Sequence, residues 1–155
     1  SYPVEVVRTM DLIARTTEDD IDYKGMHAKI CAKKGADIAN AIAHATVTTA
    51  HDLDAAAILT VTMSGVTARE ISKYRPYCPI ISCTVNERVQ RQMNLSWGVY
   101  PVLVDEVNNT DALFDSAIHA ALQSDFVNRN DIVVITAGAP VGVSNTTNMM
   151  KVERV

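Results

Sequence analysis

The chain has 155 residues and a mass of 16.9 kDa; 48% of its residues are hydrophobic and 21% are charged. This length suits one compact domain, and it is sufficient to bury a core without disulfides or metals. The composition excludes a disordered chain, a collagen-like repeat and a disulfide-dense mini-protein. The formal net charge of −4 gives no basic face in bulk, so nucleic acid is not an expected partner.

The sequence carries neither a membrane span nor a secretion signal. Its apolar runs are shorter than the roughly 18 residues that a span needs, and no charged and apolar leader pattern opens the chain. The cysteines Cys31, Cys78 and Cys83 form no CxxC pair, which favours reduced thiols. We therefore expect a cytoplasmic protein that does not bind membranes.

The N-terminal third of the chain is predicted to be mostly helical. Residues 3–17 form the first predicted helix, and its apolar residues share one stripe: Val6, Met10, Ile13 and Ala14. Residues 18–25 are polar and have no period, which indicates a linker or surface loop. Residues 37–51 are rich in alanine and predict a second helix. Its expected buried stripe consists of Ile38, Ala41, Ile42 and Ala45.

From residue 57 onward, short β-rich runs alternate with helices. Five strands are predicted, over residues 57–62, 80–84, 98–104, 131–136 and 149–155. Helices are expected between them: after Ser64-Gly65 through Tyr74, from near Asn86, and from Asn109 or Thr110 to about Ser124.

This alternation favours βαβ units and therefore an α/β domain, with helices on both faces of a mostly parallel sheet. The run Val133–Ile135 is apolar on both faces, as expected of a buried parallel strand. Pro101 indicates that strand 98–104 lies at an edge of the sheet. The last strand follows its predecessor without an intervening helix, so we expect it to be antiparallel and at an edge.

One candidate binding loop follows the first predicted strand. In open α/β sheets, ligands collect at the carboxyl ends of strands, where helix N-termini point N–H groups outward. The loop Thr62–Thr67 lies at such an end. Ser64 and Thr67 offer hydroxyls, and Gly65 allows a close approach of the backbone. The loop fits a phosphate cradle, and a simple helix cap is the alternative interpretation.

A second candidate loop follows the fourth predicted strand. Residues 137–148 contain two glycines and a run of hydroxyl and amide side chains, without any charge. The loop lacks the Gly-Lys-Ser/Thr of a P-loop, and an ordinary turn is the alternative. If the two loops face each other, their donors surround one small anionic ligand.

No catalytic, metal or cofactor site is predicted. His27 with Cys31, and His44 with His51, lack the acidic companion that would complete a metal site. No Ser–His–Asp triad is evident, and no paired carboxylates stand at strand ends. The residues therefore indicate binding rather than catalysis, and a stand-alone phosphatase is disfavoured because no acid–base constellation is present.

Three stretches of the chain resemble the C-terminal α/β domain of pyruvate kinase. They are residues 57–76, which contain Thr-Met-Ser-Gly-Val-Thr, residues 79–101, and residues 131–143 together with Thr147–Met149. They occur in the family's order over nearly the whole chain. The resemblance implies a three-layer α/β/α fold whose five-stranded mixed sheet has one antiparallel edge strand. It also implies a single domain, in which residues 1–25 are a helix and linker from the barrel side and residues 26–155 are the C-terminal domain.

The resemblance further implies where the family's reaction takes place. In pyruvate kinases, phosphoenolpyruvate, ADP, Mg²⁺ and K⁺ are bound by a catalytic barrel, which would lie upstream of Ser1. Phosphoryl transfer from phosphoenolpyruvate to ADP is therefore assigned to no residue here, and this chain alone is expected to be inactive. The family uses this domain for allosteric effectors and for part of a tetramer interface. We thus expect a homo-oligomer, dimer or tetramer, with the barrel as a further partner if the chain is a fragment.

Carried over by position, the family's effector-phosphate loop falls on Thr62, Ser64, Gly65 and Thr67. The second wall of that site falls on Gly138, Gly142, Ser144 and Thr146. Many effector-regulated members have Lys and Arg where this chain has Met63 and Val66, so two charge-assisted bonds are missing. The Arg or Trp that grips a second phosphate in some members has no match in residues 139–141. A monophosphate such as AMP or ribose 5-phosphate is therefore expected in preference to fructose bisphosphate. The alternative is a structural assembly domain that has lost its effector site.

Overall fold

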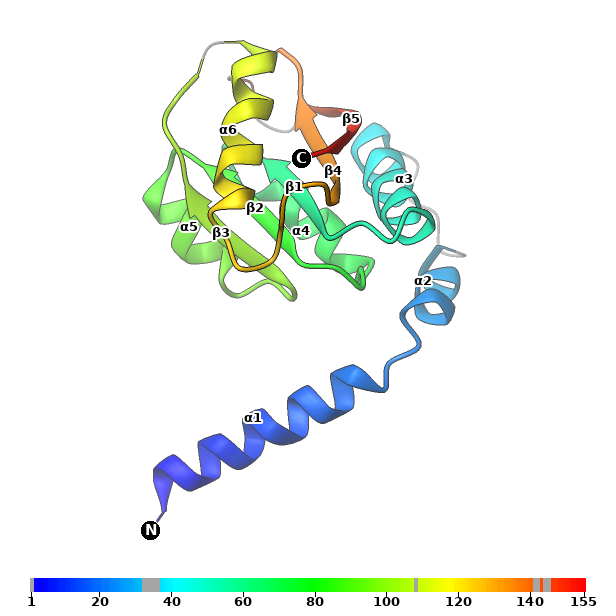
Figure 1. Ribbon diagram of the computed structural model, residues 1–155, viewed down its shortest axis with the longest axis vertical. Helices are drawn as coiled ribbons and strands as arrows, with labels where there is room; N and C mark the ends of the chain where they lie inside the picture. Colours follow the sequence, from blue (N-terminus) through cyan, green and yellow to red (C-terminus); the bar gives the residue numbers. More distant parts are fainter. Residues whose placement is uncertain (1, 32–36, 108, 141–142, 144–145) are drawn as a thin grey trace.

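The computed structural model describes residues 2–31, 37–107, 109–140, 143 and 146–155. Helices and strands alternate through most of the chain (Figure 1). In chain order they are α1 (Pro3–Asp19), α2 (Tyr23–Cys31), α3 (Ile38–Asp52), β1 (Ala57–Val61), α4 (Val66–Lys73), β2 (Ile80–Thr84), α5 (Glu87–Met93), β3 (Val99–Leu103), α6 (Thr110–Leu122), β4 (Ile132–Gly138) and β5 (Thr147–Arg154).

The strands form one five-stranded mixed sheet in the order β3-β2-β1-β4-β5. β1 pairs in parallel with β2 and β4, β2 pairs in parallel with β3, and β5 runs antiparallel to β4. The predicted fold class and the antiparallel last strand are thus confirmed. Pro101 lies in edge strand β3, as predicted, where a missing N–H costs no interior ladder bond.

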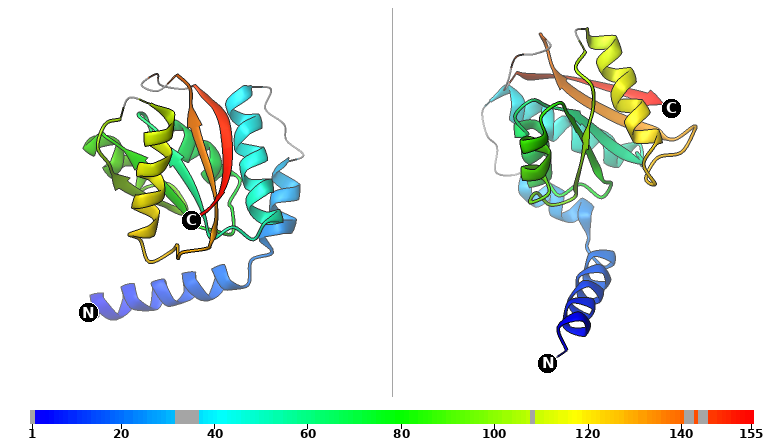
Figure 2. Two further views of the ribbon diagram at one scale, coloured as in Figure 1. Left: turned by 45° about the horizontal axis from the view of Figure 1, so that its top comes forward. Right: turned by 90° about the vertical axis from the view of Figure 1, so that its left-hand side faces the viewer.

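Helices cover both faces of the sheet, which gives three layers (Figure 1 and Figure 2). Successive strand residues point to opposite faces, so neighbours such as Ile58 and Leu59 enter different cores. Ile58 packs in a core with residues of α3, α4 and α5, whereas Leu59 packs in a core with residues of α6. Both faces of β1 are therefore buried, which explains its continuous apolar sequence.

Asparagine and aspartate side chains fix the starts of several helices. The Asp37 carboxylate accepts a hydrogen bond from Asn40 N–H at 2.7 Å before α3, and the Asn109 side chain accepts one from Ala112 N–H at 2.7 Å before α6. Asn86 caps α5 in the same way. These caps satisfy N–H groups that a helix leaves unpaired. Asn109, and not Thr110, is the cap of α6.

The predicted linker over residues 18–25 is only partly correct. α1 continues to Asp19, and α2 begins at Tyr23, in a region for which the sequence indicated no helix. The reason is local, since the Asp22 carboxylate accepts a hydrogen bond from Gly25 N–H at 2.9 Å and so starts α2. The acidic run that suggested a loop therefore contains a helix start.

α1 extends away from the sheet, with the N-terminus at its far end (Figure 1). The stripe predicted for it exists as a helix face, yet no residue of α1 is buried. Met10 and Ile13, for example, are 64% and 61% exposed. The periodicity thus predicted the helix correctly, but not its burial.

The buried face of α3 differs from the predicted one. Ile38 is 70% exposed, and the residues that α3 buries are Ala43, Thr46, Val47, Ala50 and His51. Because α3 is rich in alanine, hydrophobicity differs little around the helix, and two of its buried residues are polar. The predicted stripe was therefore wrong.

In the described part of the chain, no helix has the length and apolar character needed to cross a membrane.

Candidate functional site

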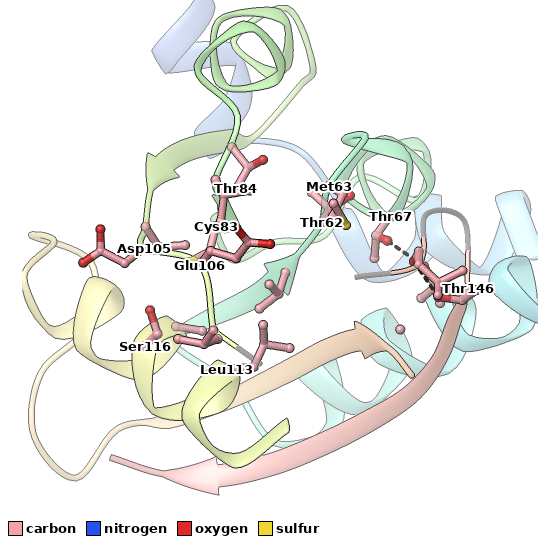
Figure 3. A pocket seen from close by; sticks show the side chains of 18 residues that line it. Thr62, Met63, Thr67, Cys83, Thr84, Asp105, Glu106, Leu113, Ser116 and Thr146 are labelled. Carbon is pink, nitrogen blue, oxygen red and sulfur yellow. Dashed lines mark hydrogen bonds between the residues drawn. The ribbon is translucent and has the colours of Figure 1, made fainter. Parts of the chain in front are cut away.

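A cavity of about 130 Å³ opens at the carboxyl ends of the parallel strands. Its walls come from the segments that follow β1, β2 and β3, from α6, and from the start of β5 (Figure 3). This is the position where ligands bind in open α/β sheets, because strand ends and helix N-termini converge there. The structure thus places a cavity where the sequence predicted a binding site.

The loop between β1 and α4 forms one wall. Gly65 adopts a left-handed backbone with φ of 75° directly before α4, a conformation that favours glycine. A Cβ atom there would also lie 3.1 Å from Met93 Cγ. The Thr62 hydroxyl oxygen accepts a hydrogen bond from Gly65 N–H at 2.9 Å. Thr62 therefore both lines the cavity and holds the tight turn in place.

The two candidate loops touch each other on one side of the cavity. The hydroxyls of Thr67, in the first turn of α4, and Thr147, at the start of β5, lie 2.6 Å apart in a buried hydrogen bond. Thr146 lies beside them and donates from its hydroxyl to the Val143 carbonyl at 2.9 Å. Gly138 permits this approach, because a Cβ there would collide with Thr146. The loops predicted separately from the sequence thus meet at one site.

The predicted site residues divide into three groups. Thr62, Thr67, Gly138 and Thr146 line the cavity. Ser64 and Gly65 belong to the same loop but do not form the cavity wall. Gly142 and Ser144 lie outside the described residues.

A further wall was not predicted from the sequence. It consists of Val104–Val107 after β3, together with Leu113 and Ser116 of α6. In Figure 3 the carboxylate of Glu106 is turned toward the interior of the cavity, and that of Asp105 is turned away from it. The strand order along the chain could have indicated this wall, because residues that follow the third parallel strand lie at the same sheet edge as those that follow the first.

The described lining of the cavity combines apolar side chains with hydroxyls, and its charged groups are negative. Among the described residues that line it, the charged ones are Asp105 and Glu106, with hydroxyls on Thr62, Thr67 and Thr146. No lysine, arginine or histidine belongs to this described lining. Hydroxyls and N–H groups can bind an anion of low charge, while the carboxylates can accept hydrogen bonds from hydroxyl or amine groups.

Among the described residues at the cavity, neither a reactive thiol nor a metal centre is found. Cys83 lies in its wall, and burial raises the pKa of its thiol to about 12, so the nucleophilic thiolate is absent at neutral pH. Cys78 and Cys83 are both free and buried. Over the described ranges, no three His, Cys, Asp or Glu side chains are grouped so that they could hold a metal ion.

Comparisons with known proteins identify the family. Residues 40–153 match the family model described as pyruvate kinase, alpha/beta domain. The chain belongs to this family. It is 43% identical to pyruvate kinase of Clostridium acetobutylicum over 155 residues, which covers 100% of the chain and 33% of that protein. It is 45% identical to pyruvate kinase of Geobacillus stearothermophilus over 151 residues, which covers 97% of the chain and 26% of that protein.

Solved structures agree with this assignment. A crystal structure of a pyruvate kinase from Cryptosporidium parvum matches with a TM-score of 0.87 and 30% sequence identity, over 99% of this chain and 30% of that one. The resemblance noted from the sequence is thus confirmed, and the chain corresponds to the C-terminal α/β domain of pyruvate kinases. It spans about a third or less of the relatives that it matches.

Proposed function

We propose that this chain is the effector-binding and assembly domain of a pyruvate kinase, and that the cavity binds a phosphorylated metabolite. The observation that carries the proposal is the meeting of the two hydroxyl-rich loops at one cavity, to which the first loop contributes Thr62 and Thr67 and the second contributes Thr146. The parent enzyme would transfer a phosphoryl group from phosphoenolpyruvate to ADP in the cytoplasm. Its Mg²⁺ and K⁺ would belong to a catalytic domain outside this chain.

The β1–α4 loop is suited to hold the phosphate. The first turn of α4 presents N–H groups that have no partner within the helix, and the helix dipole favours negative charge at that end. The left-handed turn at Gly65 brings this backbone to the cavity edge. The Thr67 hydroxyl in the cavity lining, and the Ser64 hydroxyl next to the lining residue Met63, can add hydrogen bonds to the phosphate oxygens. Such bonds to a charged acceptor are stronger than neutral ones.

The opposite wall favours a ligand with a single phosphate group. A bisphosphate needs cations for its second phosphate, yet the described lining offers the carboxylates of Asp105 and Glu106 instead. Like charges in a partly enclosed site repel one another. The hydroxyls of a ribose, by contrast, can donate to Glu106. AMP or a sugar monophosphate such as ribose 5-phosphate therefore fits the cavity better than fructose bisphosphate.

The test is titration calorimetry with AMP and ribose 5-phosphate on the wild type and on the double variant Ser64→Ala/Thr67→Ala. Each hydrogen bond to a charged group contributes about 1.5–3 kcal/mol, so the double variant should weaken binding on the order of 10²-fold or more. Thr46→Val is the matched control, because it removes a buried threonine hydroxyl on α3 that has no hydrogen-bond partner. Equal affinity of the double variant and the control would overturn the site assignment.

The second candidate function is that of a structural assembly domain whose effector site has decayed. Met63, which occupies a position where effector-regulated relatives carry a cation, favours it, since it presents an apolar side chain that is 41% exposed at the cavity. Light scattering separates the two functions. A dimer or tetramer that forms without any phosphorylated metabolite, together with no calorimetric binding, would favour assembly alone.

A further inference from the structure

Most of the chain's histidines lie together where α2 meets α3. The chain has four histidines. The His27 ring of α2 stacks on the His44 ring of α3 with centroids 5.5 Å apart, and it meets the His51 ring edge-on at 5.1 Å. The remaining histidine, His119, lies on α6 and bonds to Gln123 at an exposed site. We call the contact of His27, His44 and His51 the histidine latch.

The helical repeat explains how α3 contributes two rings. His44 and His51 are seven residues apart, which places them two turns apart on one face of the helix. Tyr74, after α4, closes the cluster, with its ring centroid 5.8 Å from that of His27 and 5.9 Å from that of His44. His27 and His51 are both buried. The latch thus joins three separate segments of the chain.

The hydrogen bonds of the latch need a neutral His51. Its Nε2 atom accepts a hydrogen bond from the backbone N–H of Tyr77 at 3.2 Å. An imidazolium carries hydrogen on both ring nitrogens and cannot accept. Protonation of His51 at this atom would therefore break its bond to the segment between α4 and β2.

The bond of His27 is compatible with both protonation states, so the cost of charge on this ring comes from its neighbours. His27 Nε2 lies 3.1 Å from the Thr48 hydroxyl oxygen, and that hydroxyl donates to the His44 carbonyl at 3.0 Å. Since a hydroxyl has one hydrogen, Thr48 accepts from His27. Charge on His27 would place it against two further imidazoles at close range.

The groups around the latch carry charges of both signs. Among the described residues, the titratable and charged side chains that face it are Asp22 before α2, Tyr23 and Lys24 of α2, Asp52 of α3, Asp54 after α3, and Tyr74, Tyr77 and Cys78 from the segment between α4 and β2. Burial lowers the pKa of His27, and His51 and His44 lower it further, while Asp52 acts in the opposite direction. Burial and Lys24 lower the pKa of His51, against Asp52 and Asp54.

α2 has a second contact with the sheet domain through Tyr23. Its ring lies 6.0 Å from the ring of Tyr77 and 6.0 Å from that of Trp97. The Arg75 guanidinium stacks over the Trp97 ring, and its carbon lies 5.0 Å from the ring centroid. No residue of α1 is buried, and the described ring contacts between the N-terminal segment and the sheet domain come from α2.

We propose that the histidine latch is a pH-sensitive device that releases α2, and α1 with it, from the sheet domain when its histidines take up protons from solvent. Both pKa shifts are downward, so the closed latch is favoured above the ordinary histidine pKa of about 6.5. It loses stability as the pH falls from there through the lower pKa values of the closed state. Each linked proton changes the ratio of closed to released molecules by about tenfold per pH unit.

Trp97 is a built-in probe, because the chain has one tryptophan and it contacts Tyr23. We expect its emission to change as the pH falls below about 6.5, while far-UV circular dichroism shows that the sheet domain stays folded. His27→Gln/His51→Gln keeps amide donors and acceptors without titrating, so the change should disappear. His119→Gln is the matched control and should behave as the wild type. A change that persists in the double variant, or no change in the wild type, would overturn the proposal.

A measurement on the wild type keeps the proposal testable if the double variant fails to fold. The four imidazoles can be titrated separately by NMR, with His119 as the exposed reference. His27 and His51 should titrate below the ordinary histidine pKa of about 6.5, and hydrogen exchange of residues 23–31 should accelerate over the same pH range while that of β1 does not. Titration of all four together, or exchange that accelerates equally in β1, would contradict a local latch.

Discussion

The sheet domain and the N-terminal segment carry similar apolar residues, yet they place them differently. Ile58 and Ile81 are fully buried, in the cores on opposite faces of the sheet. Met10 and Ile13 of α1 leave more than half of their surface exposed. The difference teaches that a periodic apolar stripe predicts a helix but not its burial. The sheet domain has its own buried cores, whereas α1 is exposed and is joined to that domain through α2.

The largest effect should come from the buried core. Ile58→Ala should lower the free energy of unfolding by about 2–5 kcal/mol, because it removes buried methyl groups and leaves a cavity. Met10→Ala, on exposed α1, should change it by less than about 0.5 kcal/mol. Urea denaturation followed by circular dichroism measures both variants. Equal losses would break the comparison, because they would mean that α1 shares the core.

A smaller effect should come from the turn that shapes the cavity. Gly65→Ala should cost about 1–3 kcal/mol, because alanine is strained at a φ of 75° and its Cβ would press against Met93 and Arg69. Gly98→Ala is the matched control: its φ is 68°, but nothing lies within 4 Å of the new Cβ. The control should therefore lose less stability, and only Gly65→Ala should also weaken ligand binding. An identical outcome for both would show that close packing plays no part at this turn.

The smallest effect on the sheet domain should come from loosening the N-terminal segment. Tyr23→Ala removes the contacts with Tyr77 and Trp97, but it should change the unfolding free energy of the sheet domain by less than about 0.5 kcal/mol. Limited proteolysis should cut the segment between α1 and α3 faster than in the wild type, while the sheet stays intact. Unchanged proteolysis would mean that the histidine latch alone suffices to hold α2.

The fold was predicted correctly from the sequence where residue type and position were compatible with only one element or one place in the sheet. Strand 80–84 is a β-rich run buried on both faces, and Pro101 marked an edge correctly. The buried face of α3 was not predicted, because alanine surrounds the helix and tertiary packing chose the side with Thr46 and His51. α2 was missed because Asp22 belongs to an acidic run that suggested a polar loop, whereas its carboxylate caps the helix. The division of the chain at residue 25 stays a prediction.

The candidate site was predicted in part. Both loops were located by their glycines and hydroxyls, because turns with positive φ and anion cradles need those residue types. The wall with Glu106 was missed, since a sequence does not show how far a loop leans over neighbouring strands. The meeting of His27 with His44 and His51 was beyond sequence reasoning for a similar reason. It depends on how α2 docks, which a few long-range side-chain contacts decide.

The most direct test of the proposed function is thermal unfolding of this chain with phosphate, sulfate, AMP, ribose 5-phosphate and fructose bisphosphate. A ligand at about 100 times its dissociation constant adds about 2.7 kcal/mol of stability, which raises the melting temperature of a domain of this size by several degrees. We predict a selective rise with AMP or ribose 5-phosphate. No rise with any of these ligands, or the largest rise with fructose bisphosphate, would contradict a monophosphate site in the cavity.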